Sequence, residues 1–234
     1  KKVSMELGGH APFIVFEDAE IDKAVEGAIQ SKFRNTGQTC VCANRLFIHE
    51  KIYDEFVKKF SKKVSLLKVG NGLEKDVVSG PLIDESSLIK IQEHVQDALN
   101  NGAKIVVGGK QHELGGTFYQ PTILINVTNK AKITYEETFG PIAPIYSFSD
   151  EKEVISMAND SPYGLASYFY SRDIGKIWRV AEALDYGIVG VNTGIISKAE
   201  APFGGMKESG LGREGSKYGL DDFLEIKYIN IAGI

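Results

Sequence analysis

Strand-type and helix-type hydrophobic patterns alternate along most of this chain, and their order is the strongest constraint on its fold. Apolar residues come in short runs in the strand-type segments and recur every three or four residues in the helical ones. The expected strands cover residues 12–16, 45–48, 103–107, 122–127, 143–148, 166–170 and 188–191, and the expected helices cover 20–37, 52–67, 88–99, 151–159 and 174–184. Strands that alternate with helices pair in parallel and need helices on both faces. The sequence therefore predicts an α/β fold in three layers, built on a mostly parallel open sheet.

The composition of the 234 residues is that of a globular chain with enough length to bury a core in one or two compact units. The 31 acidic and 27 basic side chains are spread along the sequence and give a net charge of −4, so no basic surface is gathered for nucleic acid. No apolar run approaches the roughly 18 residues that a membrane span needs, and residues 1–4 lack the apolar stretch of a signal peptide. We therefore expect a cytoplasmic protein with neither a nucleic-acid nor a membrane partner.

Three segments depart from the alternation. Residues 69–81 are predicted to be a glycine-rich loop, and the glycines that crowd the chain after Pro202 predict a structured loop or a linker. The segment 224–229 alternates apolar and polar side chains, which is typical of an edge strand. The chain begins with Lys1 instead of Met, which suggests a fragment.

The sequence contains two cysteines, Cys40 and Cys42. Together with four scattered histidines they are too few for a disulfide framework or a Cys/His zinc site, so we predict no metal. Cys40 follows a predicted helix in a turn-like sequence that can present a thiol to a cleft. A cysteine in a globular chain is more often simply buried, and Glu6 taken alone is typical of a solvated acid beside a turn. Neither residue identifies a function by itself.

Four short motifs occur in a specific order along the chain. They are Glu-Leu-Gly-Gly at 6–9, Gly-Gln-Thr-Cys at 37–40, Glu-Glu-Thr-Phe-Gly-Pro at 136–141 and Pro-Phe-Gly-Gly-Met-Lys-Glu-Ser-Gly at 202–210. Together they resemble the signatures of the aldehyde dehydrogenase superfamily. The run at 37–45, with residues 192–197 downstream, resembles the succinate-semialdehyde dehydrogenase branch in particular.

The resemblance implies that this chain is the C-terminal half of a family member. Residues 1–208 would form the catalytic thiol domain, 209–223 would return toward the cofactor domain, and 224–234 would be an oligomerisation strand that gives a homodimer or homotetramer. The N-terminal half of the family carries most of the dinucleotide site and an oxyanion-hole asparagine, and it would lie outside this chain. The chain alone is therefore expected to be inactive.

The family resemblance also implies a covalent mechanism. The Cys40 thiolate would attack the aldehyde, because the thiohemiacetal that it forms can release hydride to NAD or NADP and leave a thioester that water can cleave. The backbone N–H of Cys40 would stabilise the developing oxyanion. Glu6 would be the base that activates the water, and Glu214 would relay protons near Glu6.

Further residues match the cofactor and substrate positions of the family. Glu137 would bind the nicotinamide ribose hydroxyls, Phe139 would pack beside the nicotinamide ring, and the Leu7 carbonyl would accept a hydrogen bond from the carboxamide. On the substrate side, Arg34 would bind the remote carboxylate of succinate semialdehyde with Ser197 as its hydroxyl partner, and Phe203 would line the tunnel. Considered without the family, Arg34 is more typical of a surface residue at a helix C-terminus.

The resemblance leaves one assignment and the overall function open to alternatives. Cys42 could form a disulfide with Cys40 and act as a redox switch, or it could be a small residue that packs in the core. The chain could instead be a thiol hydrolase in which Cys40 pairs with a histidine, or a non-catalytic domain that binds partners through its terminal strand. The sequence motifs favour the aldehyde dehydrogenase over both.

Overall fold

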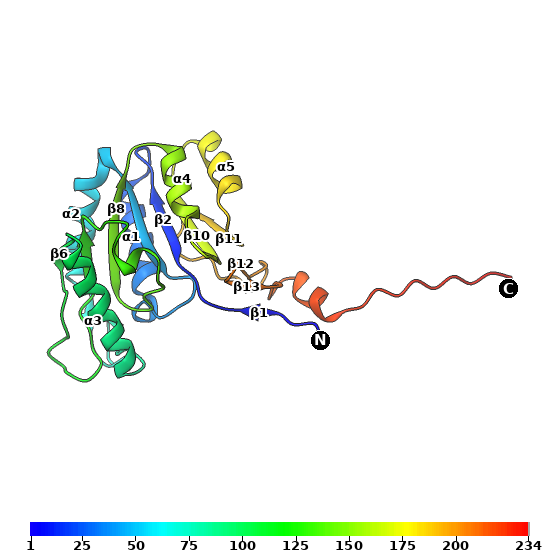
Figure 1. Cartoon of the computed structure of the whole chain (residues 1–234), viewed down its shortest axis with the longest axis horizontal. Coiled ribbons are helices and arrows are strands. Elements are labelled where there is room, and N and C mark those ends of the chain that lie inside the picture. Colours follow the sequence, from blue (N-terminus) through cyan, green and yellow to red (C-terminus); the bar gives the residue numbers. More distant parts are fainter. Residues whose placement is uncertain (234) are drawn as a thin grey trace.

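A seven-stranded sheet forms the centre of the computed structural model, which describes residues 1–233 (Figure 1). Its strands, from one edge to the other, are β11 (Ile188–Val191), β10 (Ala166–Tyr170), β2 (Ala11–Val15), β3 (Ala43–His49), β8 (Ile142–Phe148), β7 (Thr122–Ile125) and β6 (Lys104–Val107). All neighbours run parallel except β6, which is antiparallel to β7. Every residue of β2, β3 and β10 is buried, as a sheet covered on both faces requires.

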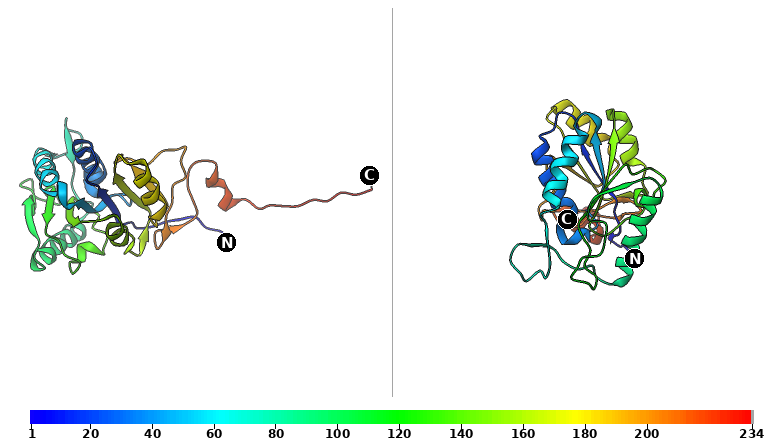
Figure 2. Two further views of the ribbon diagram at one scale, coloured as in Figure 1. Left: turned by 90° about the horizontal axis from the view of Figure 1, so that it is seen from above. Right: turned by 90° about the vertical axis from the view of Figure 1, so that its left-hand side faces the viewer.

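Helices cover both faces of this sheet (Figures 1 and 2). The helices α1 (Ile21–Phe33) and α2 (Tyr53–Val64) pack on one face, and α3 (Glu85–Asn100), α4 (Glu151–Asn159) and α5 (Ile174–Ala183) pack on the other. Alternate side chains of each strand enter the two resulting clusters: Phe13 packs with α1 and α2, whereas Ile14 packs on the opposite face. The predicted three-layer α/β fold is confirmed.

The three helices on the second face share one kind of start. Asp84, Asp150 and Asp173 each accept hydrogen bonds from backbone N–H groups of the first turn of α3, α4 and α5. Such caps satisfy N–H groups that have no partner inside the helix. They explain why these helices begin close to where the sequence predicts them.

The glycine-rich segments contain more regular structure than the sequence predicts. The expected loop at 69–81 contains β5 (Val77–Ser79), which pairs with β4 (Lys68–Val69). After Pro202, β12 (Met206–Lys207) pairs with β9 (Tyr163–Gly164), and β13 (Gly210–Leu211) pairs with β1 (Met5–Glu6). The prediction that these segments lack regular elements is wrong. The partners of β12 and β13 lie far away in the sequence, whereas β4 and β5 are neighbouring strands of only two and three residues. Short 3-10 helices complete the structure: η1 (Arg34–Gly37), η2 (Glu50–Ile52), η3 (Lys132–Thr134) and η4 (Tyr218–Phe223).

Beyond η4 the chain extends away from the body of the molecule (Figure 1). Residues 224–233 pair with no other strand within the described part of the chain, and side chains such as Ile226 and Tyr228 are exposed. The last residue of the predicted segment 224–234 lies outside the described residues. An oligomerisation strand here therefore stays a prediction. No helix among residues 1–233 combines the length and apolar character that crossing a bilayer requires.

Candidate active site

Cys40 sits on a tight turn between α1 and β3. The helix ends at Phe33, earlier than the predicted Gly37, because Asn35, Thr36 and Gly37 all have positive φ angles (51°, 60° and 72°) and reverse the chain. A side chain at Gly37 would collide with the carbonyl of Gly140, so glycine is required there. The N–H of Cys42 then donates to the Thr39 carbonyl at 3.1 Å and closes the turn, which leaves Cys40 half-buried.

The backbone around the thiol is fixed from several sides. The Tyr168 hydroxyl donates to the Val41 carbonyl at 2.7 Å, and the Ala43 N–H donates to the Ser31 hydroxyl at 3.3 Å. Gly9 approaches the Cys40 carbonyl so closely that any Cβ atom would overlap it. The first and second motifs are therefore in direct contact at Gly9 and Cys40.

Glu6 reaches the same region from β1. Its strand pairs with β13, with Glu6 opposite Gly210, and its Oε1 lies so near Gly204 that a Cβ atom there would be 3.2 Å away. Both carboxylate oxygens are buried and have no hydrogen-bond partner within residues 1–233. Burial raises the pKa of Glu6, the charge of Glu214 raises it further, and Arg213 acts in the opposite direction. A carboxylate in this state is suited to accept a proton.

Glu214 and Phe203 are joined through their backbones. The N–H of Phe203 donates to the Glu214 carbonyl at 2.9 Å, and the N–H of Glu214 donates to the Phe203 carbonyl at 2.6 Å. The Glu214 side chain is exposed, whereas Phe203 packs against the apolar cluster that also contacts Cys40. Glu6 is thus near enough to both Glu214 and Cys40 for their charges to interact, and Phe203 and Cys40 pack against the same apolar cluster.

The electrostatics of Cys40 reflect two nearby acids. Burial raises the pKa of the Cys40 thiol, and the charges of Glu6 and Glu137 raise it further, while the backbone N–H groups of Cys40 and Val41 lower it. The two carboxylates therefore disfavour the thiolate form of Cys40, and a nearby cation would act in the opposite direction.

The third motif supplies Glu137 and Phe139. The Glu137 carboxylate accepts a hydrogen bond from the Gly9 N–H at 2.9 Å. Burial raises the pKa of Glu137, and the Gly9 hydrogen bond and the charges of Lys90 and Lys32 lower it. Phe139 has a φ of +55° and is 38% exposed, so its ring projects from the surface.

An open hollow of about 430 Å³ lies beside this ring, lined by Phe139, Asn35, Gln38 and residues 81–83. Leu7, from the first motif, is also exposed, at 47%. Each of these two exposed apolar side chains is free to contact a ligand.

Arg34 and Ser197 are both exposed. Neither side chain forms a hydrogen bond or an ion pair with another residue in the range 1–233. Arg34 does follow α1 immediately, six residues before Cys40. Its guanidinium is therefore available to a ligand, although the structure does not pair it with Ser197.

Cys42 is buried, and both cysteines are free thiols. The Cys42 sulfur accepts a hydrogen bond from the Lys32 ammonium at 3.3 Å. Burial raises the pKa of the Cys42 thiol, and the charge of Lys32 lowers it. A disulfide with Cys40 would have to break this contact, so the redox switch stays a prediction.

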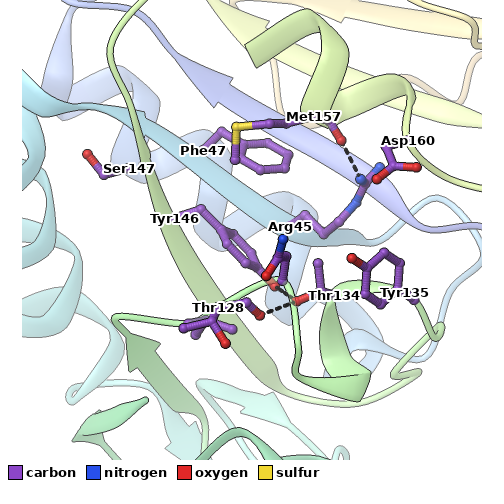
Figure 3. A pocket seen from close by; sticks show the side chains of 11 residues that line it. Arg45, Phe47, Thr128, Thr134, Tyr135, Tyr146, Ser147, Met157 and Asp160 are labelled. Carbon is purple, nitrogen blue, oxygen red and sulfur yellow. Dashed lines mark hydrogen bonds between the residues drawn. The ribbon is translucent and has the colours of Figure 1, made fainter. Parts of the chain in front are cut away.

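Figure 3 shows a second hollow, of about 400 Å³, lined by Arg45, Phe47 and Tyr146 among others. Phe47 and Tyr146 belong to the apolar cluster on one face of the sheet, whereas Cys40 packs against the cluster on the other face. The Arg45 guanidinium donates to the carbonyls of His10, Met157 and Ala158 and to the Tyr186 hydroxyl. These bonds tie β3 to the segment before β2 and to the end of α4. None of the predicted site residues lines this hollow. Among residues 1–233 no group of His, Cys, Asp and Glu side chains could hold a metal ion.

The class of protein follows from comparison with known families. The model of the aldehyde dehydrogenase family matches residues 1–229, and the chain belongs to that family. It is 62% identical over 231 residues to the NADP(+) succinate-semialdehyde dehydrogenase of Escherichia coli and 61% identical over 234 residues to a glutarate-semialdehyde dehydrogenase of Pseudomonas aeruginosa. The match covers 99% and 100% of this chain and 48% of each relative, so the chain spans about half the length of the relatives it matches.

Comparison with solved structures also relates the chain to enzymes of this kind. A crystal structure of an E. coli NADP-dependent enzyme superposes with a TM-score of 0.97 at 62% identity, over 98% of this chain and 48% of that one. The predicted resemblance to the superfamily and to its succinate-semialdehyde branch is confirmed.

Two features of the site were missed by sequence reasoning. The sequence marks Gly9 only as part of a motif, whereas the structure shows that it makes room for the Cys40 carbonyl. Lys32 was not noticed, yet a signal was available: it follows Val25 and Ala28 on the buried stripe of α1, where a charged residue is unusual.

The pH dependence of Cys40 alkylation should reveal its acidic neighbours. Glu6→Gln removes a negative charge that raises the Cys40 pKa, so the thiolate should appear at lower pH and the midpoint of iodoacetamide labelling should fall. Peptide mass spectrometry after timed labelling measures this midpoint. Glu113→Gln, at an exposed acid in the loop between β6 and β7, is the matched control and should leave it in place. A midpoint that Glu6→Gln does not lower would contradict the arrangement.

Proposed function

We propose that this chain is the thiol-bearing part of an NAD(P)-dependent dehydrogenase that oxidises succinate semialdehyde to succinate. The observation that carries the proposal is that Glu6 and Glu137 both lie close enough to Cys40 to raise the pKa of its thiol. The carboxylate oxygens of Glu6 are buried without a hydrogen-bond partner in residues 1–233, and the Glu137 carboxylate accepts a hydrogen bond from Gly9. The relatives named above, which act on semialdehydes with a remote carboxylate, support the choice of substrate.

Cys40 is the nucleophile in this proposal. Once deprotonated, its sulfur attacks the aldehyde carbon and forms a thiohemiacetal, and the N–H of Cys40 donates to the oxygen that becomes negative. The turn closed by Cys42 and Thr39 keeps that N–H and the sulfur at the same end of β3. Loss of hydride from the thiohemiacetal carbon then leaves a thioester on Cys40.

The residues present fit a dinucleotide at the site. The Glu137 carboxylate uses one oxygen for the Gly9 N–H, which leaves acceptor capacity for ribose hydroxyls, and the side chains of Leu7 and Phe139 are exposed. When bound there, NAD(P)+ supplies the hydride acceptor and a positively charged ring that counters the two acids around Cys40. The Leu7 carbonyl is suited to orient its carboxamide.

Glu6 is the base for the second half of the reaction. Because burial and Glu214 raise its pKa, the carboxylate accepts a proton from water more readily than an ordinary glutamate does. The activated water cleaves the thioester, releases the acid product and restores the thiol. Glu214, joined to Phe203 and exposed, passes the proton to solvent.

Substrate recognition is assigned to the exposed side chains near the turn. Arg34 presents a guanidinium that can bind both oxygens of a carboxylate, with Ser197 adding a hydroxyl and Phe203 an apolar wall. An aldehyde of matching length would place its carboxylate at Arg34 and its carbonyl carbon at Cys40. The reaction rates of longer semialdehydes test how strongly the site selects for this chain length.

The division of the whole enzyme follows the same proposal. Residues 1–208 form the thiol domain, 209–223 lead to a cofactor domain and 224–234 join a neighbouring subunit in a homodimer or homotetramer. The exposed apolar side chains at 224–233 support strand addition of this kind. A cytoplasmic location completes the proposal.

The rival thiol hydrolase finds less support. It requires an imidazole beside Cys40, and each histidine in residues 1–233 is engaged elsewhere. Their partners are the Thr134 carbonyl for His10, the Lys51 N–H for His49, the Glu136 carboxylate for His94 and the Leu114 N–H for His112.

The catalytic assignments predict two different failures in the full-length enzyme. Cys40→Ala should abolish reduction of the cofactor, because no thiohemiacetal can form. Glu6→Gln should still show a rapid burst of reduced cofactor and then stall, because only hydrolysis of the thioester loses its base. Stopped-flow absorbance of the reduced cofactor separates the two. Ordinary turnover in either variant would overturn the assignment, and ester cleavage without any cofactor reduction would favour the hydrolase.

Substrate choice predicts a selective effect at Arg34. Arg34→Ala should raise the KM for succinate semialdehyde by about tenfold or more, since it removes a charge-assisted hydrogen bond. An uncharged aldehyde of similar length should be almost unaffected, and Lys58→Ala, at an exposed cation of α2, should change neither. Equal losses for both aldehydes would show that Arg34 supports the turn and does not bind the carboxylate.

A further inference from the structure

Lys32 is a buried cation that the proposed mechanism does not use. It is 0% exposed in the last turn of α1, and it is the one lysine in residues 1–233 that is buried. No carboxylate lies within ion-pair distance of it in this part of the chain. Its Nζ donates instead to Asn44 Oδ1 at 2.9 Å and to Cys42 Sγ at 3.3 Å. Because burying an ammonium costs several kcal/mol, such an arrangement calls for a function.

The two partners of Lys32 lie just beyond the Cys40 turn. Cys42 closes the turn through its N–H, and Asn44 is buried at the start of β3. The hydroxyl of Ser31, the neighbour of Lys32, accepts a hydrogen bond from the N–H of Ala43, the residue between Cys42 and Asn44. The last turn of α1 therefore holds residues 42–44 in place through hydrogen bonds, and these residues come shortly after Cys40.

We propose that Lys32 is a positioning residue for Cys40, and that its ammonium fixes Cys42 and Asn44 so that the Cys40 sulfur meets the aldehyde in a productive orientation. The proposal rests on the proposed role of Cys40 as nucleophile. A methionine of similar length would fill the space of Lys32, but the Asn44 oxygen would lose its donor and the Cys42 sulfur would keep only its contacts with the backbone carbonyls of residue 32 and Ala43.

The charge of Lys32 adds to this role. Burial lowers the pKa of Lys32, while Cys42 and, further away, the charge of Glu137 raise it. In turn, Lys32 lowers the pKa of both Cys42 and Glu137. The ammonium thus links the Cys40 turn to the carboxylate assigned to the ribose.

If Lys32 only stabilises the fold, its replacement has a different effect than if it positions Cys40. A structural role would lower the melting temperature and leave the reaction of the folded enzyme unchanged. A positioning role lowers the rate of the step that Cys40 carries, while the KM for aldehyde and cofactor change little.

The first experiment compares Lys32→Met with Lys58→Met in the full-length enzyme. Lys32→Met should slow the burst of reduced cofactor by about tenfold with succinate semialdehyde and with a neutral aldehyde alike, with KM values within about twofold. It should also move the midpoint of Cys42 alkylation to higher pH, because the ammonium that lowers the Cys42 pKa is gone. Lys58→Met should do neither. A folded Lys32→Met enzyme with an unchanged burst would overturn the proposal.

A second pair of variants keeps Lys32 in place, in case Lys32→Met does not fold. Cys42→Ser retains an acceptor for the ammonium, whereas Cys42→Ala removes it, and both lack the second thiol. The alanine variant should show the slower burst, and equal bursts in the two would contradict the proposal. If Cys40→Ala retains turnover, the proposed function itself fails, and the shift of the Cys42 alkylation midpoint in Lys32→Met still measures the Lys32–Cys42 contact independently.

Discussion

Two close backbone approaches hold the site together. Gly9 lies against the carbonyl of Cys40, and Gly37 lies against the carbonyl of Gly140, so that neither position has room for a side chain. These approaches join three motifs that are far apart in the sequence. All three precede parallel strands, β2, β3 and β8, which places the site at the amino-terminal ends of the strands. Ligands of open α/β sheets more often bind at the carboxyl-terminal ends. In this chain the thiol lies at the amino-terminal ends because the glycines allow the loops to converge there.

The convergence has an electrostatic consequence. Glu6 and Glu137 are partly withdrawn from water, and their charges make the neighbouring thiol a weaker acid than a free cysteine. The same burial makes Glu6 a better base. A cation placed near these two carboxylates would act in the opposite direction and lower the pKa of the Cys40 thiol. The buried ammonium of Lys32 lies on the other side of the turn, where it pairs with Cys42 and Asn44 instead of with a carboxylate.

Much of the fold could be predicted from periodicity because the central elements are buried on well-defined faces. The strand at 166–170, the strand at 188–191 and the helix at 151–159 form where the apolar pattern predicts them. Short strands such as β1 and β13 could not be predicted, since each two-residue strand exists only through a partner about 200 residues away. The early end of α1 depends on three positive φ angles, which Asn35 and Gly37 suggest but Thr36 does not. Motifs identified the candidate residues, whereas the role of Lys32 emerged only when the structure showed its partners.

The central claim is that Cys40 carries the acyl group and that Glu6 acts on it. The most direct measurement is peptide mass spectrometry of the full-length enzyme, mixed with succinate semialdehyde and NAD(P)+ and quenched in acid during turnover. The account predicts a succinyl thioester on the peptide that contains Cys40, at low occupancy in the wild type and at near-complete occupancy in Glu6→Gln, with Cys42 unmodified. An acyl group on another residue, or an unmodified Cys40 in the Glu6→Gln enzyme, would contradict it.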